Sequence, residues 1–250
     1  MSDLRTLFPD SRLGTSLPSS TFNTLYVYNT SVNSTNNGGT CCLWTVPSNV
    51  KWARFEVWGA GGDGGGACCC QQPSMGGGSG SYARKTIRVV PGQQYTLCAA
   101  SSGCCSQACK GTDGRPSYAC NASATYPLCL CASGGYGGTS SCFTSIGGCI
   151  GCSSVVCGCA CGYDFAICGI TGANHGSWCG FDSWHYIPDA PYYGGGMRSS
   201  RTQCGEYWMG CDANGSNTFP GGGGGTAISY GGPCCWGGWG AGGLVVVTYK

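Results

Sequence analysis

Blocks of glycine constrain this chain more than any other feature. Residues 59–66 read GAGGDGGG, residues 76–80 read GGGSG, and glycine makes up 48 of the 250 residues. Glycine weakens the interior of a strand or helix, because it loses more backbone freedom on folding than other residues. Blocks of it therefore indicate places where a side chain would not fit. Collagen is excluded, since there is no strict Gly-X-Y repeat.

Three interpretations of these blocks compete. Residues 59–64 match a GxGxxG nucleotide-binding pattern, but glycine and three cysteines follow where that pattern needs a helix. A flexible linker fits badly with the aromatic and β-branched segments between the blocks. We favour polyproline II segments, which have about 3 residues per turn. All-glycine segments of this kind can pack through N–H, C=O and Cα–H groups, and a Cβ would hold the neighbours apart.

Short β-strands flank the glycine blocks. Residues 51–58 alternate, so that Ala53, Phe55 and Val57 face one side and Arg54 and Glu56 the other. Further strands are expected at 24–28, 82–90, 94–98 and 244–249, with a turn at Pro91-Gly92. The sequence predicts an all-β fold, a β-sandwich-like domain with glycine-rich, polyproline II-like connections and cysteine-rich loops.

Composition divides the chain into two parts. Residues 1–38 contain no cysteine and are rich in Ser, Thr and Asn. We expect an anchoring or assembly arm at 1–38 and a glycine-rich β domain at 39–250. An aromatic, cysteine-rich insertion is expected at about 145–220 of that domain. The strand at 24–28 could add to a partner's sheet or be the first strand of the domain itself.

The 24 cysteines leave several chemistries open. Adjacent cysteines, such as Cys41-Cys42, point to opposite faces of a strand and should have different partners. They could form disulfides after release from a cell, fill space as small buried side chains, or hold a metal or iron–sulfur cluster. We expect no cofactor. The weak metal candidates, whose spacing suits thiolate ligands only loosely, are Cys149, Cys152, Cys157, Cys159 and Cys161.

Charge and hydropathy exclude several classes of partner. Charged residues make up 9% and the net charge is +2, which leaves no basic surface for nucleic acid. The longest purely apolar run, 244–247, is far too short to span a bilayer, and the first five residues show no secretory signal. A cysteine-rich chain of this kind fits a protein made in a reducing cytoplasm that later works outside the cell.

Catalytic residue types are scarce, so we expect no enzyme. The two histidines, His175 and His185, carry no family signature with the nearby cysteines. The insertion is instead rich in aromatic residues, which bury a large area at recognition surfaces with few rotatable bonds. A core between loops or a subunit interface would use the same residues. The candidates for receptor contact are Trp178, Trp184, His185, Tyr186, Tyr192, Tyr193, Tyr207 and Trp208.

Five motifs occur in order across residues 41–250. They are TVPSNV with FEVWGAGG at 45–62, GSYA at 80–83, VVPGQQY at 89–95, GGTSS at 137–141 and GAGGLVVV at 240–247. Together they resemble the glycine-rich domain of phage tail fibres and related virion appendages. The resemblance implies a β-sandwich-like domain, often at a fibre tip and commonly trimeric. The cysteines and the insertion depart from the family.

The resemblance implies a virion protein, made in the host cytoplasm and exposed after release. We expect a tail-fibre or spike protein, at the tip, that attaches to a host-surface glycan or protein. The arm would contact other virion proteins, and the assembly would be a homotrimer. Two alternatives stay open: a purely structural baseplate, collar or capsid-decoration protein, and a metal- or cluster-binding cysteine-rich protein.

Overall fold

The regular secondary structure in the described residues is all β. The computed structural model describes residues 22–28, 39–65, 77–101, 111–138, 163–167, 169, 219–224 and 237–250, and the backbone alone of 202–204, 207–209 and 228–229. The strands are β1 (Asn23–Tyr28), β2 (Thr40–Thr45), β3 (Trp52–Trp58), β4 (Tyr82–Arg88), β5 (Gln94–Ala99), β6 (Ser117–Asn121), β7 (Leu128–Ala132), β8 (Phe165–Ile167), β9 (Thr202–Cys204), β10 (Tyr207–Met209), β11 (Ile228–Ser229) and β12 (Leu244–Tyr249).

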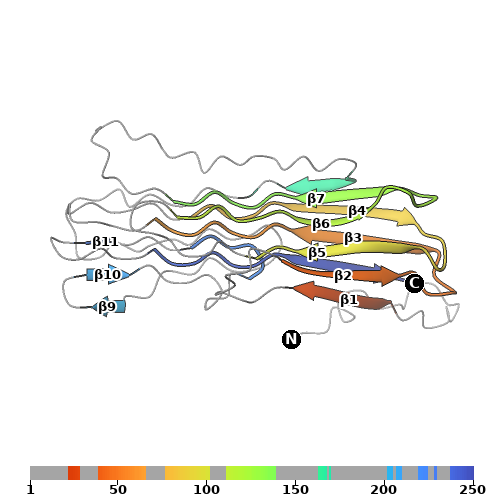
Figure 1. Ribbon diagram of the computed structural model, residues 1–250, viewed down its shortest axis with the longest axis horizontal. Helices are drawn as coiled ribbons and strands as arrows, with labels where there is room; N and C mark the ends of the chain where they lie inside the picture. The colour runs from red at the N-terminus through yellow and green to blue at the C-terminus, as the bar shows by residue number, and fades with distance from the viewer. Residues whose placement is uncertain are drawn as a thin grey trace, which may run out of the picture.

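Two antiparallel sheets form a sandwich, which confirms the predicted fold class. The five-stranded sheet has the order β1-β12-β3-β4-β8, and the four-stranded sheet has the order β2-β5-β6-β7. A separate three-stranded sheet, β11-β10-β9, lies at the opposite end of the molecule from the sandwich (Figure 1).

The sandwich core lies between the two large sheets and follows the predicted alternation. In β3, Phe55 and Val57 are buried and Arg54 is exposed. The rings of Trp44, Phe55 and Tyr95 pack at the centre, with centroids 5.3, 5.7 and 6.0 Å apart. Aromatic pairs of this kind each contribute about 0.5–1.5 kcal/mol beyond the area they bury.

The first strand belongs to the domain's own sheet. β1 pairs antiparallel with β12 along its whole length. Val27 is buried in the sandwich core and Leu25 packs against it, while Tyr26 and Tyr28 are exposed. Of the two roles that the sequence left open for this strand, the structure shows the first strand of the sandwich.

Glycine-rich segments extend the sandwich in one direction. They are 59–65, 77–81, 111–115, 133–138, 219–224 and 237–243, and we call them the glycine bundle. Five of them directly continue β3, β4, β6, β7 and β12. Figure 1 shows them as undulating traces that run side by side away from the arrows of the strands.

Hydrogen bonds in the bundle repeat every third residue. In segment 59–65, Gly59 and Gly62 donate to 77–81, Ala60 and Asp63 donate to 111–115, and Gly61 and Gly64 donate to 237–243, at 2.8 to 3.0 Å. Successive N–H groups therefore point in directions about 120° apart, as in a polyproline II helix with about 3 residues per turn. This repeat confirms the packing that we favoured from the sequence.

Interior glycines of the bundle leave no room for a side chain. A Cβ at Gly62 would overlap the carbonyl of Tyr136, and one at Gly114 would overlap that of Ala60. An α-hydrogen points there instead, and such Cα–H···O contacts are worth about 0.5–1 kcal/mol each. Positive φ is not the reason for these glycines, because among the described residues it occurs at Gly92, in the predicted turn, and at Gly221.

Segment 59–65 is the centre of the bundle. It exchanges backbone hydrogen bonds with each of the other five segments. Its two residues with side chains, Ala60 and Asp63, are three positions apart and therefore lie on one side of the segment. Both are fully buried, and Asp63 Oδ1 accepts a hydrogen bond from Gly240 N at 2.9 Å.

The sixth segment, 219–224, covers the outer face of the five-stranded sheet. Trp58, Tyr82, Leu244 and Val246 form a second buried cluster there, with Phe165 and Phe219 packed against it. The Tyr82 hydroxyl donates to Glu56 Oε1 at 2.6 Å. Burial and the Glu56 carboxylate raise the pKa of Tyr82 above its ordinary value. Outward-facing aromatics of β3 and β4 are thus buried by a segment from far along the chain.

We predict that Gly114→Ala lowers the free energy of unfolding by about 3 kcal/mol, because the new Cβ must displace the backbone of segment 59–65. The matched control is Thr112→Ala in the same segment, where the side chain is exposed. The free energy of unfolding of that variant should stay within about 1 kcal/mol of the wild-type value. Urea unfolding followed by tryptophan fluorescence measures both. Equal losses in the two variants would show that the bundle tolerates a Cβ.

Candidate functional site

The segments of the glycine bundle end together, away from the sandwich. Hydrogen bonds join residues near their ends in pairs: Gly64 N to Gly238 O at 2.8 Å, Gly77 N to Gly224 O at 2.9 Å, and Gly111 N to Gly138 O at 2.7 Å. We call these six residues the distal end. Backbone groups alone make these bonds, so the distal end is a hydrogen-bonded platform from which other parts of the chain depart.

Four stretches of chain begin or end at this platform. They are 66–76, 102–110, 139–162 and 225–236. They contain three, three, six and two cysteines respectively, which is fourteen of the 24. Fourteen of the 24 cysteines thus belong to stretches that are joined to the distal end at one or both of their ends.

Most of the expected receptor-contact residues lie outside the described residues. These are Trp178, Trp184, His185, Tyr186, Tyr192 and Tyr193. Tyr207 and Trp208 are neighbours in β10, the central strand of the three-stranded sheet, opposite Cys204 and Gln203 of β9. In Figure 1 this sheet lies beyond the glycine bundle. The backbone thus places two of the eight candidates at the distal side of the molecule.

The expected metal ligands also lie outside the described residues: Cys149, Cys152, Cys157, Cys159 and Cys161. Among the residues that the structure does describe, no three His, Cys, Asp or Glu side chains gather in a metal-binding arrangement.

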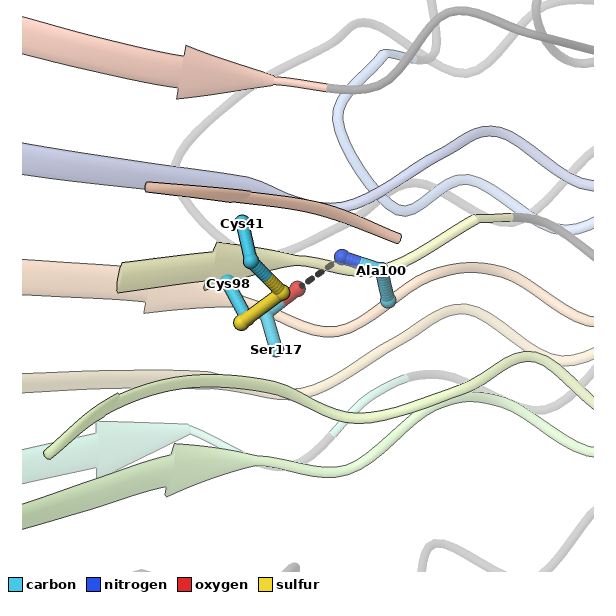
Figure 2. The surroundings of a disulfide bond; sticks show 4 residues. All are labelled: Cys41, Cys98, Ala100 and Ser117. Carbon is cyan, nitrogen blue, oxygen red and sulfur yellow. Dashed lines mark hydrogen bonds between the residues drawn. A yellow bond between two sulfur atoms is a disulfide. The ribbon is translucent and has the colours of Figure 1, made fainter. Parts of the chain in front are cut away.

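A disulfide joins Cys41 of β2 to Cys98 of β5. The two residues are direct partners across the strands, with their Cα atoms 4.1 Å apart. Figure 2 shows it beside Ser117, whose Oγ accepts a hydrogen bond from Ala100 N at 3.0 Å. The bond therefore lies where the four-stranded sheet passes into the bundle.

The neighbour of Cys41 behaves differently, as the alternation of faces predicts. Cys42 is directed to the other side of β2, where it packs against the sandwich core. Burial raises the pKa of its thiol. The expectation that adjacent cysteines point to opposite faces of a strand is confirmed for this pair, of which Cys41 is bonded to Cys98 and Cys42 is a free thiol.

The outer face of the four-stranded sheet carries a group of cysteines, which we call the cysteine face. Its members are Cys41, Cys98, Cys120, Cys129 and Cys131. They share this face because they alternate with buried residues such as Leu97, Ala119 and Leu130. The alternation of β6 and β7 could have indicated this face from sequence, but neither strand was predicted.

An aromatic group that the sequence pattern did not indicate lies at the end of the sandwich opposite the bundle. The Arg88 guanidinium lies 5.7 Å from the ring centroid of Trp52 and 5.7 Å from that of Tyr126. Both rings are partly exposed, at 53% and 37%. Exposed cation–π contacts contribute about 0.5–1 kcal/mol each. This group joins β3, β4 and the β6–β7 connection.

We predict that replacing both Cys41 and Cys98 with serine lowers the free energy of unfolding by about 4 kcal/mol. The chain-entropy estimate for a separation of 57 residues gives this value. Urea midpoints measured with and without dithiothreitol test it. The double variant should differ from the wild type without reductant and match it with reductant. A difference that persists in reductant would assign the loss to side-chain packing instead of the cross-link.

Comparisons with known proteins place the chain in a family. No helix of the described part is long and apolar enough to span a membrane. A search of curated proteins found no match. The sequence profile of a glycine-rich domain matches residues 34–250, which include the sandwich from β2 onward and the whole glycine bundle. The chain therefore belongs to the glycine-rich domain family.

Proposed function

We propose that this chain is a virion appendage protein, of the tail-fibre or spike type, that contacts the host surface through its distal side. The observation that carries the proposal is the common end of the six bundle segments, from which the long connecting stretches depart. Such an architecture would let the connecting stretches act as binding loops on a backbone-packed support. Binding loops on a rigid scaffold are a common arrangement for recognition.

The glycine bundle suits the role of a support. Its central segment is bonded on all sides, and its glycines exclude side chains from the contacts. Its interior positions therefore require glycine, and the contacts between segments are made by backbone groups instead of large side chains. The loops at its end can vary without disturbing the contacts that hold the segments together.

The aromatic insertion suits the role of the contact surface. Tyr207 and Trp208 lie in the three-stranded sheet on the distal side, and the remaining candidates belong to the same insertion. Aromatic rings offer large flat apolar faces. A host-surface glycan or an exposed protein loop is the class of receptor that such rings would bind.

The sandwich side suits assembly with other virion proteins. β1 is the last strand in its sheet, and Tyr26 and Tyr28 on it are 56% and 55% exposed. Phe22, just before it, is 66% exposed. Aromatic side chains on an edge strand could pack against further copies of the chain or against a virion partner. The arm expected at 1–38, which contains this strand, would contact the same partner.

A second candidate is a purely structural protein of the baseplate, collar or capsid surface. The fourteen cysteines in the stretches attached to the distal end favour it. Cross-links between neighbouring proteins could use that many thiols, whereas a receptor surface has no need of them.

We predict that the labelled full chain binds cells or purified surface polysaccharide from at least one member of a bacterial panel. Replacing Trp178 and Trp184 with alanine should weaken binding about 30-fold, as loss of a hot spot of about 2 kcal/mol does. The matched control replaces Trp52 and Tyr126, at the opposite end, and should bind as the wild type does. Urea unfolding must show that both double variants are folded.

Two results would contradict the receptor role. One is a full chain that binds no cell or polysaccharide but is incorporated into particles, which would support the structural alternative. The other is an equal loss of binding in both double variants, which would show that binding does not depend specifically on the aromatic insertion. Deleting residues 170–215 provides a stronger form of the same comparison.

We also predict a homotrimer in solution. Light scattering of the folded chain at micromolar concentration should give about three times the 25.5 kDa of one copy. Tyr26→Ser combined with Tyr28→Ser should shift the mass toward one copy if the β1 edge holds the trimer. A wild-type mass of 25.5 kDa would show that the chain is a monomer.

A further inference from the structure

Two cysteines of the cysteine face are direct partners across a pair of strands. Cys120 of β6 lies opposite Cys129 of β7. The thiol of Cys129 is close enough to raise the pKa of the Cys120 thiol. Cys129 is exposed and Cys120 is partly exposed, so reagents in solution can reach the pair. The same relation between direct partners holds for Cys41 and Cys98, which are already joined.

Backbone hydrogen bonds show that the two pairs occupy the same kind of site. The Gln93 carbonyl oxygen accepts a hydrogen bond from Val46 N, which follows β2. The odd-numbered residues of β5 therefore direct their backbone groups toward β2. Gln94 O accepts from Asn121 Nδ2, and Ala100 N donates to Ser117 Oγ, both on the β6 side. Even-numbered residues of β5 therefore direct their backbone groups toward β6. Cys41 and Cys98 consequently face each other without hydrogen bonds between their backbones.

The same reasoning extends across the sheet. Cys98 lies opposite Tyr118, so the backbone groups of Tyr118 must point back toward β5. Cys120, two residues further along β6, has the same orientation as Tyr118. Cys120 and Cys129 are thus also a non-hydrogen-bonded pair, in which side chains approach most closely, with Cα atoms typically about 4.5 Å apart. Disulfides need Cα atoms about 4.4–6.8 Å apart, so the pair needs little backbone movement to join.

We propose that Cys120 and Cys129 are a reversible redox site that closes a second cross-strand disulfide by exchange with a small-molecule disulfide. The exposed Cys129 thiolate attacks that disulfide, forms a mixed disulfide and releases one small thiol. The Cys120 thiolate then attacks the Cys129 sulfur and releases the second small thiol. Two protein thiols are oxidised, one small disulfide is reduced to two thiols, and the two thiol protons pass to the released thiolates.

Closing this bond would link β7, the second outer strand of the four-stranded sheet, covalently to its neighbour β6. β2 and β7 are the outer strands of the four-stranded sheet. Cys41–Cys98 already ties β2 to β5, and the new bond would tie β7 to β6. β6 and β7 also continue into bundle segments 111–115 and 133–138. The cross-link would lie near the β6–β7 turn, three residues along each strand from Ser117 and Ala132, where the bundle segments join.

The surroundings of Cys120 give the exchange a pH dependence. Burial, and then the adjacent Cys129 thiol, raise the pKa of Cys120 above its ordinary value, and burial still does so in the second step, when Cys129 is held in the mixed disulfide. Its thiolate is correspondingly scarce at neutral pH, and thiolate is the attacking species. The second step should therefore quicken as pH rises from neutral toward the ordinary thiol pKa and beyond it.

The test uses the full chain and oxidised glutathione as the probe. The protein is incubated with the probe, alkylated, and digested under mildly acidic conditions with chymotrypsin, which cuts after Tyr118 and Leu128. The two cysteines then fall in different peptides, joined only if the disulfide has formed. Mass spectrometry should find this linked pair beside the Cys41–Cys98 pair. Reduced glutathione in tenfold excess should reverse it.

Single variants separate the two steps. In Cys120→Ser, Cys129 should accumulate one bound glutathione, because the thiol that would displace it is missing. In Cys129→Ser, the linked peptides should be absent. The control Cys42→Ser, on the inner face, should form the bond as the wild type does. The proposal is overturned if the Cys41–Cys98 peptides are found without the Cys120–Cys129 peptides, or if Cys120 is joined to a different cysteine.

Discussion

Direct contact between backbones, made where no Cβ intervenes, is the interaction on which the rest of this structure depends. Segment 59–65 lies among five neighbours, and its N–H groups turn to three of them in succession. Buried backbone polar groups must be paired, and here neighbouring backbones supply the partners that strands or helices supply elsewhere. A chain with 9% charged residues can therefore order a large part of itself with few side chains.

The sandwich passes into the glycine bundle as the side chains along the segments become smaller. Sheets that pack through side chains lie about 10 Å apart, which is too far for backbones to touch. Small residues mark the passage between the two arrangements. Ser81 Oγ donates to Ser133 O at 3.1 Å, and Ala100 N donates to Ser117 Oγ at 3.0 Å. Short hydroxyl side chains thus bond across the junction, and beyond them the layers close to backbone contact.

Cysteine acts on a different part of the structure from glycine. In the sandwich, Cys42 packs against the core, but the other cysteines lie on the outer face of the four-stranded sheet, where a disulfide can tie an outer strand to its neighbour. Edge strands carry unpaired backbone groups and are prone to unwanted pairing. The Cys41–Cys98 bond ties the outer strand β2 covalently to β5 and adds nothing to the shape of the bundle. Glycine therefore determines the architecture, and cysteine secures it.

The sequence by itself determined local geometry: the faces of β3, the turn at Gly92, and the backbone packing of the glycine blocks. These follow from alternation, from turn chemistry and from the absence of Cβ, all of which are local. Only the tertiary structure decided which segments are neighbours, because glycine segments present nearly identical backbone groups and lack the side chains that would specify a particular neighbour. It alone placed 219–224 over Trp58 and Tyr82, joined Cys41 to Cys98, and brought Tyr207 and Trp208 to the distal side.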